Sequence, residues 1–221
     1  MTFDDAVRNR RSVRGFLPVR VPDAILRESL ELAQLAPSNC NAQPWVVHAV
    51  SGDSLTRLRQ DLVDAAKAGQ PANPDFPADV RRFTGIHRER QIDAAVQLYG
   101  AMGIARNDVS GRKWAYLRNY ACFDAPHVVF VFIEAQFGPR EIHDLGMYGQ
   151  TLLLALAARG IASCMQGALG EYPDIVRQHL GIGPQFMLMH GISIGYEDPQ
   201  AKANGARVGR VPIGEAVHFH D

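Results

Sequence analysis

Cationic side chains gather at two places in the sequence, one near each end. Residues 10–14 read Arg-Arg-Ser-Val-Arg, and Arg207 and Arg210 lie in the C-terminal segment. Guanidinium groups bind phosphate through charge-assisted and often bidentate hydrogen bonds, and a neighbouring hydroxyl can add one more. Either cluster alone is also typical of a solvated basic turn. If the two ends of the chain meet in the fold, the clusters together predict a clamp for a phosphate dianion.

Two further segments carry groups that could contact a ligand. Residues 37–45 read Pro-Ser-Asn-Cys-Asn-Ala-Gln-Pro-Trp and lie between a predicted helix and a predicted strand. Amide side chains both donate and accept hydrogen bonds, so such a loop can recognise the edge of a heteroaromatic ring. Residues 164–168 read Cys-Met-Gln-Gly-Ala after a short predicted strand, where the glycine lets backbone amides approach a ligand closely.

Several common catalytic motifs are missing from the sequence. No Gly-x-Gly-x-x-Gly follows a predicted strand, and no phosphate-binding Gly-Lys-Ser/Thr occurs. The histidines are scattered and there is no Cys-x-x-Cys, so we expect no metal site. Residues 191–195 match Gly-x-Ser-x-Gly, which would make Ser193 the nucleophile of a serine hydrolase. Because a turn rather than a helix follows, we favour a small residue inside a buried strand.

Composition and charge limit the class of protein. The chain has 221 residues, of which 47% are hydrophobic, and it carries 23 Lys and Arg against 23 Asp and Glu. A net charge of zero provides no overall field toward nucleic acid or an anionic membrane, so neither is an expected partner. Three widely spaced cysteines are typical of a reducing compartment. With an acidic N-terminus and no apolar run near the ~18 residues of a membrane span, we expect a cytoplasmic protein.

The hydrophobic pattern predicts an α+β or α/β fold around one mainly buried sheet. The strands are expected at residues 45–50, 127–133, 162–165 and 186–194. The helices are expected at residues 3–9, 22–36, 53–67, 89–100, 113–123, 142–158 and 173–180. The run 142–158 is apolar nearly all round, which is typical of a central core helix. We expect one domain over residues 1–221, with a variable lid or substrate region at 71–112 and a tail at 196–221.

In their order and type, these segments resemble the FMN-dependent nitroreductase family. The resemblance rests on residues 10–14, on Ala-Pro-Ser at 36–38, on Asn-Ala-Gln-Pro-Trp at 41–45, on the apolar helix that leads into 160–166, and on Arg-Val-Pro-Ile at 210–213. It implies a three-layer α/β/α domain with a mainly antiparallel sheet. It also implies a homodimer with two FMN sites at the subunit interface, in which the C-terminal tail wraps the partner.

The resemblance further assigns roles to single residues. The FMN phosphate would be held by Arg10, Arg11, Ser12, Arg210 and Arg207, with Arg14 nearer the ribityl chain. The partner subunit would supply Pro37, Ser38, Asn39, Asn41 and Gln43, with Trp45 at the dimer interface. The backbone at Met165, Gln166 and Gly167 would face flavin N5 and O4, where charge grows on reduction. Many members have Pro-Ile-Glu-Gly at this point, whereas residues 165–168 here read Met-Gln-Gly-Ala.

The activity implied by the resemblance is a ping-pong oxidoreduction. FMN would take electrons from NADH or NADPH and pass them to a nitroaromatic or quinone-like acceptor, and no catalytic side chain is needed because the flavin carries the hydride chemistry. Tyr99 is a candidate for contacting the acceptor. Quinone reductases, dehalogenases and dehydrogenases share the same scaffold, and a non-catalytic FMN-binding protein is a further alternative.

Overall fold

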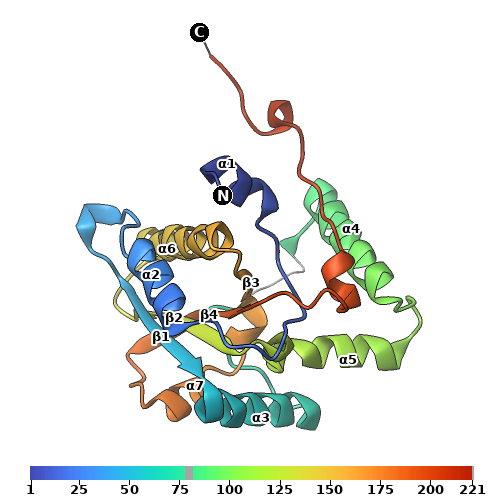
Figure 1. The fold of residues 1–221 in the computed structure, drawn as a ribbon, viewed down its shortest axis with the longest axis horizontal. Coiled ribbons are helices and arrows are strands. Elements are labelled where there is room, and N and C mark those ends of the chain that lie inside the picture. Colours follow the sequence, from blue (N-terminus) through green and yellow to red (C-terminus); the bar gives the residue numbers. More distant parts are fainter. Residues whose placement is uncertain (78–81, 221) are drawn as a thin grey trace.

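The computed structural model describes residues 1–77 and 82–220, and its centre is a four-stranded sheet (Figure 1). The strands are β1 (Trp45–Ser51), β2 (His127–Glu134), β3 (Ala162–Gln166) and β4 (Phe186–Gly195). They lie in the order β1-β2-β4-β3, and every neighbouring pair is antiparallel. From His127 to Ile133 every residue of β2 is buried, as the apolar run of this segment predicts. The expected α+β fold is therefore confirmed.

Helices cover both faces of the sheet and make three layers (Figure 1). One face packs against α2 (Asp23–Ala33) and α6 (Pro139–Ala158), while α1 (Phe3–Asn9) contacts α6. The other face packs against α3 (Gly52–Ala68), α5 (Val109–Tyr120) and α7 (Pro173–Leu180). The remaining long helix, α4 (Gly85–Met102), has no buried residue and contacts the C-terminal segment.

The long central helix α6 has the position that its apolar sequence predicts. Its first turn starts with Pro139, and the Glu141 carboxylate accepts a hydrogen bond from the Gly138 N–H at 3.0 Å. Its buried side chains include Leu145, Tyr148, Leu152 and Leu156, which face the sheet. At ~1.5 Å per residue the helix is about 30 Å long, so its two ends lie at opposite sides of the domain.

Several element ends differ from the sequence prediction. Helix α5 stops at Tyr120 rather than at residue 123, because Cys122, Phe123 and Asp124 have φ angles of 51°, 53° and 65°. Left-handed backbone cannot continue a right-handed helix. Burial of Phe123 against Val13 compensates for this unfavourable conformation. At α2, Pro22 is the residue before the helix rather than part of its first turn.

Trp45 lies in the core of its own subunit, which corrects its expected place at a dimer interface. The residue is 6% exposed, and its ring centroid is 5.0 Å from that of Tyr148 in α6. Its indole N–H donates a hydrogen bond to Gln34 at 2.9 Å, so the polar atom is also satisfied within the chain. An indole is mostly apolar surface, and burying it against α6 stabilises the fold of a single subunit.

The region expected to form a lid, residues 71–112, divides into parts with different surroundings. Residues 78–81 are outside the described residues. Before them, Asp75 accepts hydrogen bonds from both terminal nitrogens of Arg177, at 2.6 and 3.3 Å, and from the Leu188 N–H at 2.7 Å. This part is thus anchored to α7 and β4. Helix α4 and the start of α5 make up the rest of the region.

Candidate functional site

An extension of the sheet brings the first basic cluster to the edge strand. Ser12 forms a parallel bridge with Ser163 of β3, and the Val13 N–H donates to the Ser163 carbonyl at 3.1 Å. Val13 also packs with Phe16, Phe123 and Cys164 in a small apolar cluster. The buried valine therefore fixes the segment, and the arginines on either side of it project from a backbone that is held in place.

The C-terminal segment returns to the same edge. The Leu17 N–H donates to the Tyr196 carbonyl at 2.9 Å, and the Asp198 N–H donates to the Gly15 carbonyl at 3.0 Å. The chain then makes a short turn, η5 (Lys202–Gly205), beside α4. The two ends of the chain thus meet, which is the condition that the sequence alone left open for a phosphate clamp.

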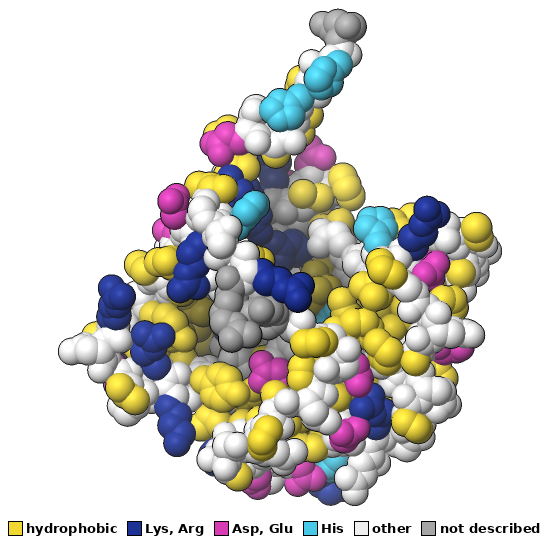
Figure 2. Space-filling view, turned by 180° about the vertical axis from the view of Figure 1, so that it is seen from behind, with side chains coloured by type: hydrophobic (Ala, Val, Ile, Leu, Met, Phe, Trp, Pro, Cys, Tyr) yellow, Lys and Arg dark blue, Asp and Glu magenta, His cyan; other side chains and the backbone are white. Residues whose placement is uncertain are grey.

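The meeting of the two ends forms a pocket of about 680 Å³ lined mainly by arginines. Arg10, Arg11, Ser12, Arg14, Arg207 and Arg210 all line it, together with Arg8. Val7, Ala94, Ala95, Leu98, Ala206 and Val208 complete its described walls, so no carboxylate is among them. Figure 2 shows Lys and Arg side chains gathered in a hollow on this face, below the protruding tail. We call this cavity the arginine pocket.

Two features of the arginine pocket suit a bound anion. Arg11 is held by an ion pair between its Nη2 and the Glu197 carboxylate, while its buried Nη1 has no hydrogen-bond partner in the described part of the chain. The Arg207 and Arg210 side chains are held in place by hydrogen bonds to backbone carbonyls. These bonds measure 2.5 and 2.9 Å for Arg207, and 2.9 and 3.2 Å for Arg210. Six guanidinium groups around one cavity repel one another, and a dianion would relieve that repulsion.

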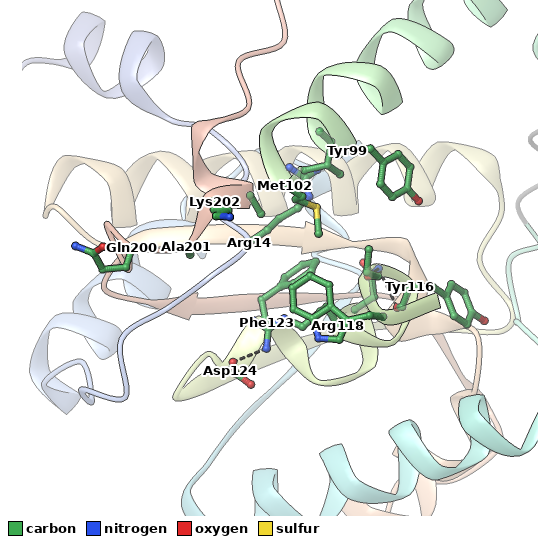
Figure 3. A pocket seen from close by; sticks show the side chains of 15 residues that line it. Arg14, Tyr99, Met102, Tyr116, Arg118, Phe123, Asp124, Gln200, Ala201 and Lys202 are labelled. Carbon is green, nitrogen blue, oxygen red and sulfur yellow. Dashed lines mark hydrogen bonds and ion pairs between the residues drawn. The ribbon is translucent and has the colours of Figure 1, made fainter. Parts of the chain in front are cut away.

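A second pocket, of about 590 Å³, adjoins the first one and is mostly aromatic and apolar. It lies between α4, α5 and η5, and it shares Arg14 and Leu98 with the arginine pocket. Figure 3 shows Arg14 reaching between Met102 above and Phe123 below. The other described side chains that line this second pocket include Tyr99, Trp114, Tyr116, Arg118, Asp124, Gln200 and Lys202. We call this cavity the aromatic pocket.

The end of β3 differs from the rest of the strand in its exposure. Met165 is 36% exposed, and an added side chain at Gly167 would meet no atom within 4 Å, so open space lies in front of this backbone. The Gln166 side chain is buried: it donates to the Asn119 carbonyl at 3.0 Å and accepts from Ser193 at 2.5 Å. The Gln166 side chain is therefore not available to a ligand, and the exposed positions at this end of β3 are Met165 and Gly167.

Ser193 has the structural role that we favoured over a nucleophile. It is fully buried within β4, and its hydroxyl donates to Gln166. A hydrolase nucleophile stands exposed on a sharp turn between a strand and a helix, and Ser193 lies inside the strand. The match of residues 191–195 to Gly-x-Ser-x-Gly therefore does not indicate a serine hydrolase.

The polar loop at residues 37–43 lies away from both pockets. Asn39, in the turn η1 (Asn39–Asn41), contacts Asp144 and Glu141 at the start of α6 through hydrogen bonds of 2.9 and 3.3 Å. The Ser38 hydroxyl accepts the Gln43 N–H at 2.9 Å. The first basic cluster is bound to β3, which follows the opposite end of α6. The loop and the arginines of one chain therefore lie apart (Figure 1). Pro37 and Asn41 lie in the same separated loop.

Sequence reasoning missed residues that shape the site without offering obvious chemistry. Leu98 lines both pockets, and Asn204 and Glu197 bind the arginine-bearing segments. Helix α4 shows no sequence periodicity that would have marked Leu98, since none of its residues is buried. Asn204 acts on backbone atoms of distant segments, a role that leaves no motif. Tyr99, by contrast, was a candidate from the sequence and does line the aromatic pocket.

His190, in β4, makes the stability of this region depend on pH. It is 7% exposed and faces Gly149 of α6, and burial lowers its pKa to about 4. An unfolded chain has a histidine pKa near 6.5, so protonation favours unfolding. Neutral His190 contributes fully to the free energy of unfolding above pH 6.5, and this contribution is lost as the pH falls toward 4. We expect the free energy of unfolding to fall by about 2 kcal/mol from pH 7 to pH 5.

Urea unfolding at these two pH values measures this effect. The His190→Gln variant should lose most of the difference, while His218→Gln, in the exposed tail, should keep it. Burial also lowers the pKa values of His48 and His127, so some dependence of the same sign will remain. An equal pH dependence in wild type and His190→Gln would contradict the assignment.

Among the residues that the structure describes, no helix is long and apolar enough to cross a membrane. No group of three or more His, Cys, Asp or Glu side chains within residues 1–77 and 82–220 is arranged to hold a metal ion.

The fold and the site together define an α+β protein with an arginine-lined pocket at the edge of its sheet, formed where the two ends of the chain meet. The model of the Nitroreductase family matches residues 7–196, and the chain belongs to that family. Nitroreductase NfnB of Mycolicibacterium smegmatis is 41% identical over 213 residues, which are 96% of this chain and 90% of that protein. A 4-nitrobenzoate reductase of Nocardioides sp. is 34% identical and covers 98% of this chain and 89% of its own length.

Solved structures agree with the sequence comparison. The crystal structure of the FMN-dependent nitroreductase NfnB from Mycobacterium smegmatis, in complex with NADPH, matches with a TM-score of 0.95 at 39% identity, over 99% of this chain and 97% of that one. An FMN- and NADPH-dependent nitroreductase NfnB from a Sphingopyxis strain matches equally well, with a TM-score of 0.95 at 34% identity over the full length of both chains.

Proposed function

We propose that this protein is an FMN-dependent oxidoreductase that takes electrons from NADPH or NADH and passes them to nitroaromatic or quinone-like acceptors. The observation that carries the proposal is the arginine pocket, which adjoins an aromatic pocket in a chain of the Nitroreductase family. Relatives that are 34–41% identical over nearly the whole chain are named as nitroreductases, and two solved ones as FMN-dependent.

The donor set of the arginine pocket fits the phosphate of FMN. A phosphate monoester carries close to two negative charges near neutral pH and three acceptor oxygens. The pocket offers several guanidinium groups and the Ser12 hydroxyl, and Arg11 has a buried nitrogen without a hydrogen-bond partner in the described part of the chain. A neutral cofactor would leave these cations uncompensated. We therefore assign the phosphate to Arg10, Arg11, Ser12, Arg207 and Arg210.

The remaining parts of the site would orient the rest of the cofactor. FMN, when bound, supplies the hydride chemistry, and the protein supplies position and electrostatics. Arg14 lines both pockets and is placed to contact the cofactor between its phosphate and its ring. The backbone beside Gly167 would bind the polar edge of the ring, because Gly167 is exposed and the open space in front of it allows close approach. Ser193 and Asn119 hold the Gln166 side chain and so fix that backbone.

The aromatic pocket is the proposed site for the electron acceptor. Tyr99, Trp114, Tyr116 and Phe123 offer ring surfaces for a planar aromatic molecule, and aromatic pairs of this kind attract by about 0.5–1.5 kcal/mol beyond the burial of area. Tyr99 is itself held in place, since the Arg112 guanidinium lies 5.3 Å from its ring centroid. Its position supports the role expected from the sequence.

We further propose that the active form is a homodimer. The polar loop 37–43 lies at the start of α6 and none of its residues lines either pocket, so a second copy would have to bring it to a cofactor. The tail protrudes from the body (Figure 1) and exposes Val208, Val211, Ile213, Val217 and Phe219. These apolar side chains support a tail that packs on the partner. Light scattering at several concentrations tests the dimer, and a monomer that retains full FMN content would refute a shared site.

A cytoplasmic location is part of the proposal. The three cysteines are unpaired, which is typical of a reducing compartment, and NADPH and NADH are supplied there.

The visible absorption spectrum of the purified protein, before and after anaerobic addition of NADPH and then NADH, tests the proposed function. We expect a flavin band that bleaches with at least one donor and returns when a nitroaromatic acceptor is added. A band that persists with both donors would instead support a protein that binds FMN without turnover. If no band forms even after incubation with FMN, the proposed function is wrong.

A further inference from the structure

Asn204 lies where three segments of the arginine pocket come together. It is 5% exposed, and its side chain uses both of its polar atoms. The Oδ1 atom accepts the Arg14 N–H at 2.7 Å, and the Nδ2 atom donates to the Gly15 carbonyl at 2.9 Å and to the Asp198 carbonyl at 3.0 Å. Its own backbone carbonyl accepts a hydrogen bond from Arg207 at 2.5 Å.

We propose that Asn204 is a positioning residue for the cofactor phosphate. It contacts the backbone of Arg14 on one side and the guanidinium of Arg207 on the other, so one residue sets the spacing between the two basic clusters. Asn204 is not among the described residues that line the arginine pocket, and it acts through those that do. The proposal rests on the proposed function, because it presumes that a phosphate binds there.

The geometry requires an amide at this position. The side chain must accept one backbone N–H and donate to two carbonyls, and only Asn and Gln carry both kinds of group on one planar head. A carboxylate would keep the contact with Arg14 but would face the carbonyls of Gly15 and Asp198 without a donor. The Gly15 carbonyl keeps the Asp198 N–H at 3.0 Å and the Asp198 carbonyl keeps the Ala201 N–H at 3.2 Å, so the substitution loosens the packing around residue 204 without releasing either segment.

The fold itself is expected to survive the loss of this amide. The Asp198 N–H still donates to the Gly15 carbonyl at 3.0 Å, and the Leu17 N–H still donates to the Tyr196 carbonyl at 2.9 Å. These backbone bonds keep the C-terminal segment at the sheet. What is lost is the fixed position of Arg207 relative to Arg14, and this affects a ligand that both guanidinium groups hold.

Comparing FMN with riboflavin tests the proposal, because riboflavin has the same ring and ribityl chain without the phosphate. Dissociation constants of both are measured by quenching of flavin fluorescence for wild type, Asn204→Ala and Asn204→Asp. We expect the FMN constant to rise about tenfold or more in both variants, the size of a lost charge-assisted hydrogen bond, and the riboflavin constant to stay within about twofold. Asn73→Ala is the matched control, since Asn73 bridges to Asp174 outside the pocket at 2.5 Å.

A second measurement asks whether Asn204 acts through Arg207. In an Arg207→Ala background, Asn204→Ala should weaken FMN binding by less than it does in the wild type, because the group that it positions is gone. An unchanged FMN affinity in both Asn204 variants would overturn the proposal, and so would an equal loss of affinity for FMN and riboflavin, which marks a general structural effect. If wild type itself shows no preference for FMN, the phosphate assignment of the proposed function fails instead.

Discussion

Replacing Arg11 with alanine is expected to raise the dissociation constant of FMN by about 30-fold or more. The Arg11 guanidinium is held by Glu197, and its other terminal nitrogen is buried in the wall of the arginine pocket. The substitution removes a charged donor and also leaves the Glu197 carboxylate without its cation beside the phosphate site. The Arg11 and Glu197 side chains are 28% and 33% exposed, so we expect a cost near the lower end, about 2 kcal/mol, of the range for desolvated charge pairs, and each ~1.4 kcal/mol is a factor of ten in affinity. Fluorescence titration at fixed ionic strength measures the change.

Two companion variants sharpen this result. Arg20→Ala removes an exposed arginine that pairs with Asp23 at 3.5 Å, outside both pockets, and should leave FMN binding unchanged. Arg11→Lys keeps the positive charge but loses the planar fork, so its FMN affinity should fall between those of wild type and Arg11→Ala. An FMN affinity in Arg11→Ala equal to that of Arg20→Ala would remove Arg11 from the phosphate site.

The fold was largely predictable because its core elements carry strong hydrophobic patterns. Residues 127–133 are apolar at nearly every position, and the corresponding strand is buried on both faces. Helix α6 was expected from its apolar run and lies in the central position foreseen for it. The ends of α5 were less predictable, since the left-handed backbone at Phe123 depends on its burial against Val13, a tertiary contact that leaves no local signal.

The candidate site was predictable only in part, for a related reason. The residue types of Arg10–Arg14 and Arg207 indicated phosphate, but their meeting depends on backbone bonds between residues about 180 positions apart, such as that from Asp198 to Gly15. Asn204 has no charge and belongs to no motif, so its role is visible only in three dimensions. The assignment of these residues to FMN stays a prediction until binding is measured.

Gly15→Ala is expected to separate the two ends of the chain and to weaken FMN binding about tenfold or more, with a fall of about 5 °C in the melting temperature. A side-chain carbon at Gly15 would lie 2.2 Å from the Ala201 Cβ, far inside contact distance. Neither backbone can retreat freely, because the Gly15 carbonyl accepts hydrogen bonds from Asp198 and Asn204 at 3.0 and 2.9 Å. Thermal unfolding and FMN titration measure the two effects.

A matched pair of variants distinguishes this clash from a general effect of removing a glycine. Gly214→Ala, in the exposed tail outside both pockets, meets no atom within 4 Å and should leave both the melting temperature and the FMN affinity unchanged. Adding Ala201→Gly to Gly15→Ala removes the atom that is struck, so the double variant should recover most of the FMN affinity, although the glycine at 201 brings its own small entropic penalty. If the double variant binds FMN no better than Gly15→Ala, the close packing of these two residues does not hold the arginine pocket together.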